Sequence, residues 1–228
     1  MAGDKPVQRV MRVLRTKEEA RRSYDRLSRW YDLFSGTGEF KLALETLDLM
    51  NLPVGGTILE VGFGTGRILL ELTRRVGEHG QVYGVDLSQG MCRITRRRLE
   101  KAGELTRVLL TAGDGYRLPI APGSVDGIFM GFTLELFDTP ELLPVVQECL
   151  RILKPGGQLG IVTLSVSNRS GFAERLYKLA HTRWPRLVDC RPIDPVSLLA
   201  KAGIFYETLI FKKMWGLSVA QLVLVKDG

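Results

Sequence analysis

The stretch that decides the fold is Ile58-Leu59-Glu60-Val61-Gly62-Phe63-Gly64-Thr65-Gly66-Arg67. A short apolar run ends in an acid, three glycines follow at every second position, and an amphipathic segment comes next. This order predicts a strand, a tight turn and a helix. Glycine lets the backbone bend sharply and approach a ligand, and the following helix directs free N–H groups at whatever lies above the turn. The stretch therefore predicts a nucleotide-type binding turn.

The spacing of the glycines leaves three interpretations open. A dinucleotide-binding turn has the pattern G-x-G-x-x-G. Here the third glycine comes one residue early, and Arg67 stands where that pattern needs it. The pattern E-x-G-x-G-x-G, with Glu60 two residues before Gly62, resembles motif I of class I S-adenosylmethionine-dependent methyltransferases. A glycine-rich loop that only turns the chain is the third interpretation.

The composition bounds the class of protein. The chain has 228 residues, of which 45% are apolar, as expected for one globular domain with a full core. No apolar run approaches the ~20 residues that span a bilayer, and no secretory signal is apparent. Three widely spaced cysteines fit a reducing cytoplasm, and with only two histidines they predict no metal site. The net charge of +7 leaves open nucleic acid, an anionic membrane, an acidic substrate or a plain solvated surface.

The N-terminal residues 1–35 are predicted to be helical and basic. An aromatic and apolar face is formed by Tyr24, Leu27, Tyr31 and Phe34, at positions i, i+3, i+7 and i+10. This face could pack on the edge of the domain, or it could cover a cofactor, with Tyr24 and Tyr31 facing a sulfonium through cation–π attraction. A basic amphipathic segment can also rest on an anionic membrane, so a peripheral membrane contact stays open.

Acids follow two further predicted strands. Asp86 ends the strand 82–86, about 20 residues beyond the glycine turn, where a ribose needs an acceptor for its hydroxyls. Because Ser88 is better placed as the N-cap of the next helix, Asp86 is left free for a ligand. Leu87 adjoins this acid, and Met91 is predicted to lie against an adenine face.

Asp114 follows the strand 107–112. Its carboxylate could accept a hydrogen bond from an adenine amino group, while the Gly115 N–H donates to a ring nitrogen. A turn carboxylate is the simpler alternative.

The second half of the chain is predicted to complete an α/β sheet. A strand at 125–130 leads to Phe132, which could stack beside adenosine, and to Glu135, which is either a base facing the acceptor or an ordinary ion-paired glutamate. A helix at 139–153, a strand at 158–164, a helix at 194–203 and two final strands at 204–211 and 218–225 follow. The segment 165–190 is predicted to be an insert on the acceptor side. It contains His181, a candidate base because of its pKa near ~6.5.

These motifs together resemble the class I S-adenosylmethionine-dependent methyltransferases over residues 20–225. The "GD…LP" segment at Asp114 and the run Lys154-Pro155-Gly156-Gly157 before a strand extend the resemblance begun at the glycine turn. The chain is most similar to the ubiquinone/menaquinone C-methyltransferase-like group (methyltransferase type 11). This implies a Rossmann-like seven-stranded sheet, mostly parallel with an antiparallel C-terminal hairpin and helices on both faces. It also implies an N-terminal helical flap at 1–50 and a methyltransferase domain at 51–228.

The resemblance implies S-adenosylmethionine as the cofactor, with S-adenosylhomocysteine as the product. Asp86 would hold the ribose and Asp114 the adenine, which leaves the amino-acid end of the cofactor to the glycine turn. There Gly62 and Gly64 would let the backbone close in, Phe63 and Gly66 of the same turn would also contact the cofactor, and Glu60 would lie near the cofactor's amino group. For a base, the sequence offers only the candidates His181, Glu135 and Tyr31.

The acceptor is less well defined. The repeated pairs Tyr24-Asp25 and Tyr31-Asp32 resemble a segment of the quinone enzymes. Those enzymes continue with a His-Arg-x-Trp-like stretch, whereas this chain has Gly38-Glu39-Phe40-Lys41. The aromatic N-terminus and the insert predict a small hydrophobic or lipid-like acceptor, either a quinone precursor or a phospholipid-like molecule. An RNA or protein methyltransferase is the alternative suggested by the positive net charge. The sequence lacks the (Asn/Asp)-Pro-Pro-(Tyr/Phe) clamp of nucleobase amino-methyltransferases and a separate nucleic-acid module. A non-catalytic cofactor-binding protein is the other alternative.

Overall fold

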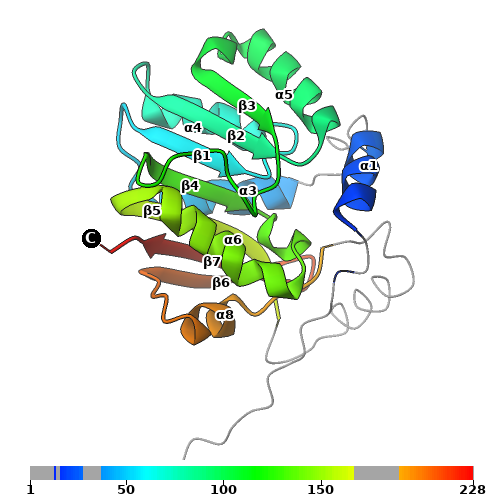
Figure 1. Ribbon diagram of the computed structural model, residues 1–228, viewed down its shortest axis with the longest axis vertical. Coiled ribbons are helices and arrows are strands. Elements are labelled where there is room, and N and C mark those ends of the chain that lie inside the picture. The colour runs from blue at the N-terminus through cyan, green and yellow to red at the C-terminus, as the bar shows by residue number, and fades with distance from the viewer. Residues whose placement is uncertain (1–12, 14–15, 28–36, 167–189, 228) are drawn as a thin grey trace, which may run out of the picture.

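The computed structural model describes Val13 and residues 16–27, 37–166 and 190–227. In these ranges a seven-stranded sheet has the order β3-β2-β1-β4-β5-β7-β6 (Figure 1). β1 to β5 run parallel, and β7 pairs antiparallel with both β5 and β6. This confirms the predicted methyltransferase-type sheet with its antiparallel end. The strands are β1 Thr57–Val61, β2 Gln81–Asp86, β3 Val108–Ala112, β4 Val125–Gly131, β5 Leu153–Ser165, β6 Thr208–Met214 and β7 Leu217–Val225.

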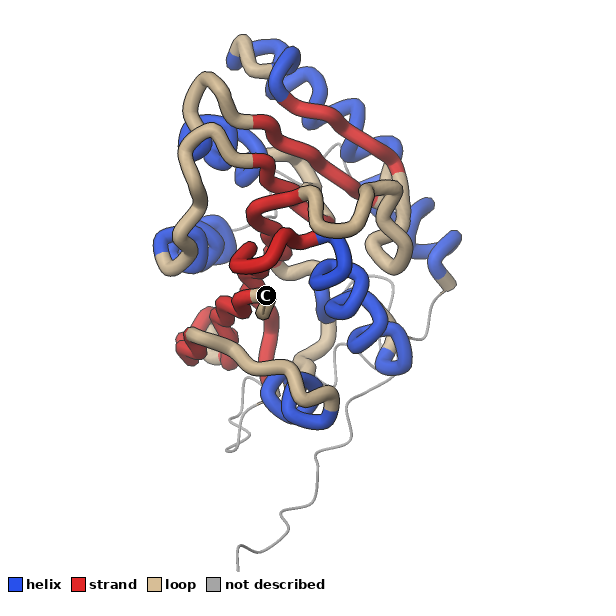
Figure 2. Tube along the Cα trace, turned by 60° about the vertical axis from the view of Figure 1, so that its left-hand side comes forward, coloured by secondary structure: helices blue, strands red, loops and turns tan. Residues whose placement is uncertain are grey.

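Helices cover both faces of the sheet (Figure 2). One core lies under α3 (Thr37–Asp48), α4 (Arg67–Val76) and α5 (Gln89–Ala102), and the other under α6 (Thr139–Ile152) and α8 (Pro195–Lys201). Parallel strands buried on both faces need continuous apolar runs, as in Ile128-Phe129-Met130 of β4. α1 (Lys17–Leu27) lies apart, beyond the carboxyl ends of the strands (Figure 1).

The order of the strands positions the site. β1 lies between β2 and β4, so the connections that leave β1 and β4 diverge to opposite sides. Ligands of such sheets bind in the crevice at the carboxyl ends of the strands, where the order reverses. The glycine turn follows β1 at this point, and the predicted N-cap at Ser88 is confirmed because its side chain accepts a hydrogen bond from Met91 N.

Two predicted boundaries are wrong. β5 begins at Leu153 and includes the run Lys154-Pro155-Gly156-Gly157, since Leu153 already pairs with Val125 before the register shifts. β6 begins at Thr208, where pairing with Val223 starts, so the preceding aromatic residues lie outside the strand. Of the predicted insert at 165–190, residues 167–189 lie outside the described part of the chain.

Candidate active site

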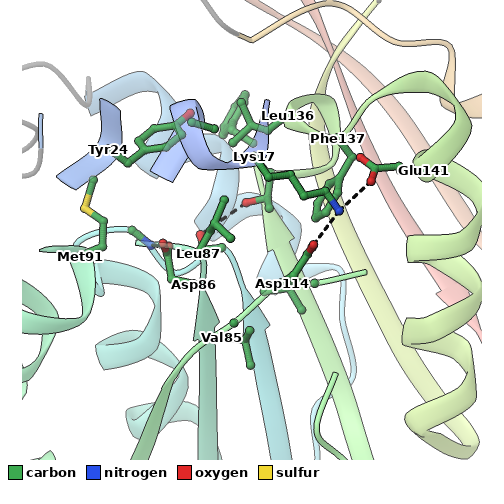
Figure 3. Close-up of a pocket in the computed structure, with 18 of the residues that line it drawn as sticks. Lys17, Tyr24, Val85, Asp86, Leu87, Met91, Asp114, Leu136, Phe137 and Glu141 are labelled. Atoms are coloured by element: carbon green, nitrogen blue, oxygen red, sulfur yellow. Dashed lines mark hydrogen bonds and ion pairs between the residues drawn. The ribbon is translucent and has the colours of Figure 1, made fainter. Parts of the chain in front are cut away.

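A pocket opens at the carboxyl ends of β1, β2 and β4, with α1 as its roof (Figure 3). It measures about 990 Å³ including its open mouth. This is at the upper end of the range for small-molecule sites. Most of the residues that the sequence predicts for the cofactor line it: Tyr24, Gly62, Gly64, Asp86, Leu87, Met91, Asp114, Gly115 and Phe132.

The three glycines of the turn have different structural roles. Gly62 has φ +76°, and a Cβ there would collide with the side chain of Thr133. Gly64 has φ +52°, and a Cβ there would meet nothing within 4 Å, so the space beside it is open to the pocket. Gly66 packs against Thr95 and precedes α4, so it shapes the turn from behind. Only glycine combines these backbone angles with such close packing.

Asp86 is fixed by the backbone on both oxygens. Its Oδ2 accepts from Gly64 N at 2.9 Å, and its Oδ1 accepts from Ser88 N at 2.8 Å. Burial raises the pKa of Asp86 to about 6, although both backbone N–H groups lower it. Each carboxylate oxygen can accept more than one hydrogen bond, so the held carboxylate can still receive hydroxyl groups from a ligand.

Glu60 and Phe63 are placed differently from the predicted pocket residues. Phe63 is 4% exposed and packs in the core. Glu60 is 3% exposed and does not line the pocket, and its Oε2 has no hydrogen-bond partner among the described residues. Burial and the nearby charge of Asp86 raise the pKa of Glu60 well above its ordinary value. A cation close to this carboxyl group would lower its pKa again and favour the ionised form. The role of Glu60 at the amino end of a cofactor stays a prediction.

The predicted adenine end is occupied by an ion pair that the sequence did not suggest. Asp114 Oδ1 accepts from Tyr116 N at 3.0 Å, while Oδ2 lies 2.6 Å from Lys17 Nζ. The same ammonium lies 2.7 Å from Glu141 Oε1 on α6 (Figure 3). Lys17 therefore joins α1 to both sides of the pocket.

α1 is also attached at its other end. Asp25 Oδ1 accepts from Ser88 Oγ at 2.6 Å and from Gly90 N at 2.7 Å, which fastens α1 to the start of α5. The pocket-facing residues of α1 are Thr16 (just before it), Lys17, Ala20 and Tyr24. Their spacing follows one helical face, so periodicity could have found them. The partners of Asp25 and Lys17 could not be found in that way.

The side of the pocket beyond β4 is more apolar. Phe132, with φ +50°, donates its N–H to Val162 O at 2.8 Å, and Leu136 adds further wall. The ring of Phe137 lies near Gly115, toward the predicted adenine end. Together these features suit a nucleoside with an amino-acid tail. Acids at two strand ends can accept its hydrogen bonds, apolar faces lie between them, and the space beside Gly64 is open.

Glu135 does not line this pocket. Its side chain is fully buried, its Oε2 accepts from Thr163 Oγ1 at 2.7 Å, and its Oε1 accepts from Leu164 N at 3.1 Å. Burial raises its pKa to about 7 against the effect of these hydrogen bonds. The two other candidate bases, Tyr31 and His181, lie outside the described residues, so the base role stays a prediction for all three.

Comparison with known proteins identifies the family of the chain. A family model described as a methyltransferase domain matches residues 58–157. The demethylmenaquinone methyltransferase of Listeria welshimeri is 32% identical over 164 residues, covering 70% of this chain and 68% of that protein.

Solved structures with the same fold include two methyltransferases. One is a SAM-dependent methyltransferase from Aquifex aeolicus, with a TM-score of 0.64 and 22% identity over 87% of this chain and 98% of that one. The other is a geranyl diphosphate C-methyltransferase from Streptomyces coelicolor, solved with S-adenosylhomocysteine, with a TM-score of 0.68 and 16% identity over 82% and 79% of the two chains. The chain belongs to the class I S-adenosylmethionine-dependent methyltransferases, close to the menaquinone group, and is an enzyme of that kind.

Proposed function

We propose that the enzyme methylates a small hydrophobic acceptor of the quinone type. The observation that carries this proposal is the 32% identity to a demethylmenaquinone methyltransferase, which extends over two thirds of both chains. Leu136, on the side of the pocket beyond β4, supports it, because an aromatic ring system needs apolar surfaces. A phospholipid-like acceptor is the alternative within the same chemical class.

We assign the cofactor to the pocket residues as follows. Asp86 accepts the ribose hydroxyls, Asp114 accepts from the adenine amino group, and Met91 and Phe132 flank the nucleoside. The open side of Gly64 takes the amino-acid end, with Glu60 behind it. Bound S-adenosylmethionine supplies an electrophilic methyl group. The protein's own part is to hold the acceptor in line with that group and to exclude water, and α1 provides the cover.

A base is needed only where the accepting atom must lose a proton. His181 and Tyr31 stay candidates for this step. For Glu135 the role requires a rearrangement that exposes its carboxylate, because the side chain is fully buried and does not line the pocket. We therefore propose that the described residues contribute mainly by positioning the acceptor and the cofactor, and less by proton transfer.

An acceptor of this kind partitions into membranes, so we also propose that the enzyme works in the cytoplasm with peripheral contact to a membrane. Among the described residues, no helix is both long enough and apolar enough to cross a bilayer.

Transfer of a labelled methyl group tests the acceptor. We expect label from S-adenosylmethionine to enter a demethylated naphthoquinol with a short prenyl tail, and not phosphatidylethanolamine or RNA. Asp86→Ala should abolish the transfer by weakening cofactor binding. Label in RNA or protein alone would refute the proposal, and cofactor binding with label in no fraction would favour a binding protein.

A further inference from the structure

The hairpin between β6 and β7 carries an exposed tryptophan in an unfavourable position. Trp215 and Gly216 form the two-residue turn, with φ of +50° and +80°. Turns that need positive φ at both positions favour asparagine followed by glycine, and a bulky side chain there is strained. Trp215 is also 64% exposed, so core packing does not compensate for this strain.

Cationic and aromatic residues lie on the strand that leads to this tryptophan and on the helix beside it. Because side chains alternate along a strand, Lys212 lies on one face of the hairpin, and Phe211 and Lys213 lie on the other. Phe211 on β6 is 52% exposed, and Lys212 and Lys213 follow it. Lys212 lies on the α3 side, where its Nζ is 3.8 Å from Glu45, which also pairs with Lys41 at 3.9 Å. We call Lys41, Phe211, Lys212, Lys213 and Trp215 the tip patch. Three lysines against Glu39 and Glu45 of α3 leave it positively charged.

The tip patch lies at the edge of the sheet where the pocket opens. β7 runs antiparallel to β5, and Ser218, next to the turn, pairs with Ser165 at the carboxyl end of β5. A Cβ on Gly38, at the start of α3, would lie 3.5 Å from Met214 beside the turn. Figure 1 shows this end of the hairpin on the same side as α1.

A second pair of exposed aromatic residues lies outside the tip patch. Phe205 and Tyr206 are 82% and 40% exposed but precede β6, at the opposite edge of the sheet. They adjoin Glu207, so their surroundings do not favour an anionic partner. The tip patch combines aromatic residues with lysines, as membrane-interface anchors do: the rings enter the headgroup region and the ammonium groups meet anionic lipid.

We propose that the tip patch seats the enzyme on an anionic lipid bilayer, with the pocket edge of the sheet facing the membrane. The proposal rests on the proposed function, since an acceptor dissolved in the bilayer must enter from that side. The strained Trp215 is then retained for binding to lipid and not for folding.

Sedimentation with vesicles tests this. We expect the full chain to bind phosphatidylglycerol/phosphatidylcholine vesicles and to bind pure phosphatidylcholine far less. Trp215→Asn should weaken binding about tenfold, because a large aromatic surface no longer enters the interface. Lys212→Gln and Lys213→Gln should each weaken it about fivefold, the effect of one lysine near an anionic surface. Phe205→Ser is the matched control and should bind as the parent does.

A thermal melt separates binding from folding. Asparagine suits the turn, so Trp215→Asn should melt no lower than the parent. In a Trp30→Phe/Trp184→Phe background, brominated lipid should quench the fluorescence of Trp215.

Several results would overturn the proposal: no vesicle binding by the parent, equal binding to neutral vesicles, unchanged binding of the tip variants, or absence of quenching. Vesicle binding without methylation of a quinol would instead refute the proposed function and leave the anchor standing.

Discussion

Asp86 is part-buried and Glu135 is fully buried, both at the carboxyl edge of the same sheet, and they differ in what holds them. Burial raises the pKa of both, to about 6 and about 7. Asp86 is held by backbone N–H groups of the glycine turn and of the start of α5, and it lines the pocket. Glu135 is held by Thr163 and Leu164 of β5 and does not. An acid at a strand end therefore becomes a site only where its partners leave it facing a cavity.

The largest expected effect is on stability, at Glu135. Glu135→Ala should lower the free energy of unfolding by about 3 kcal/mol, because a cavity forms and two buried donors lose their acceptor. Cofactor affinity should change little. Urea unfolding and calorimetry measure the two quantities. Glu135→Gln, which keeps an acceptor, should cost about 1 kcal/mol. Full stability with lost methyl transfer would show that Glu135 is catalytic and not structural.

At Asp86 the effect should fall on the cofactor. Asp86→Asn should weaken binding of S-adenosylmethionine about 100-fold, because hydrogen bonds from ribose to a charged acceptor are lost or misdirected. Titration calorimetry gives the affinity. Ser124→Ala, on an exposed turn far from the pocket, is a suitable control. A loss below about threefold would remove the ribose role.

The pKa of Asp86 predicts a pH dependence. The ionised carboxylate is the form that accepts from a ribose, so affinity should fall as pH drops through about 6. It should be about tenfold weaker at pH 5 than at neutral pH. The unliganded protein should respond oppositely at this group. Its folded pKa is raised from 3.8, so the group's stabilising contribution is present at low pH and is lost as pH rises through about 6. Asp86→Asn should show neither dependence.

The smallest effect on cofactor binding should come from α1, the roof of the pocket. Asp25→Ala removes the hydrogen bonds that fasten α1 to Ser88 and Gly90, so cofactor should dissociate about tenfold faster, as expected for one or two lost hydrogen bonds to a charged group. Stopped-flow displacement measures this rate. Glu18→Ala is the matched control, because Glu18 is exposed and pairs with Arg21 and Arg22 of the same helix. Equal rates for both variants would mean that α1 does not retain the cofactor.

Local signals predicted much of this molecule. The glycine turn, Asp86 and the Ser88 cap follow from residues close together in sequence, and their positions agree with the structure. The boundaries of β5 and β6 were missed because cross-strand pairing sets them, not the local pattern. The contact of Lys17 with Asp114 joins residues 97 apart, and the burial of Glu135 depends on a neighbouring strand. Neither the contact nor the burial can be predicted from the periodicity of a single segment.

The attachment of α1 also bears on the order of folding. Asp25 binds residues 63 and 65 positions later, and Lys17 binds Asp114 97 positions later. α1 can dock only after β2, β3 and the start of α5 are in place, so it should be the last of these elements to join. Because α1 is held by these few long-range contacts, it should also open locally without unfolding of the sheet. Its amide hydrogens should then exchange with solvent before those of β1. Product release would then need only this local opening, at a fraction of the free energy of global unfolding.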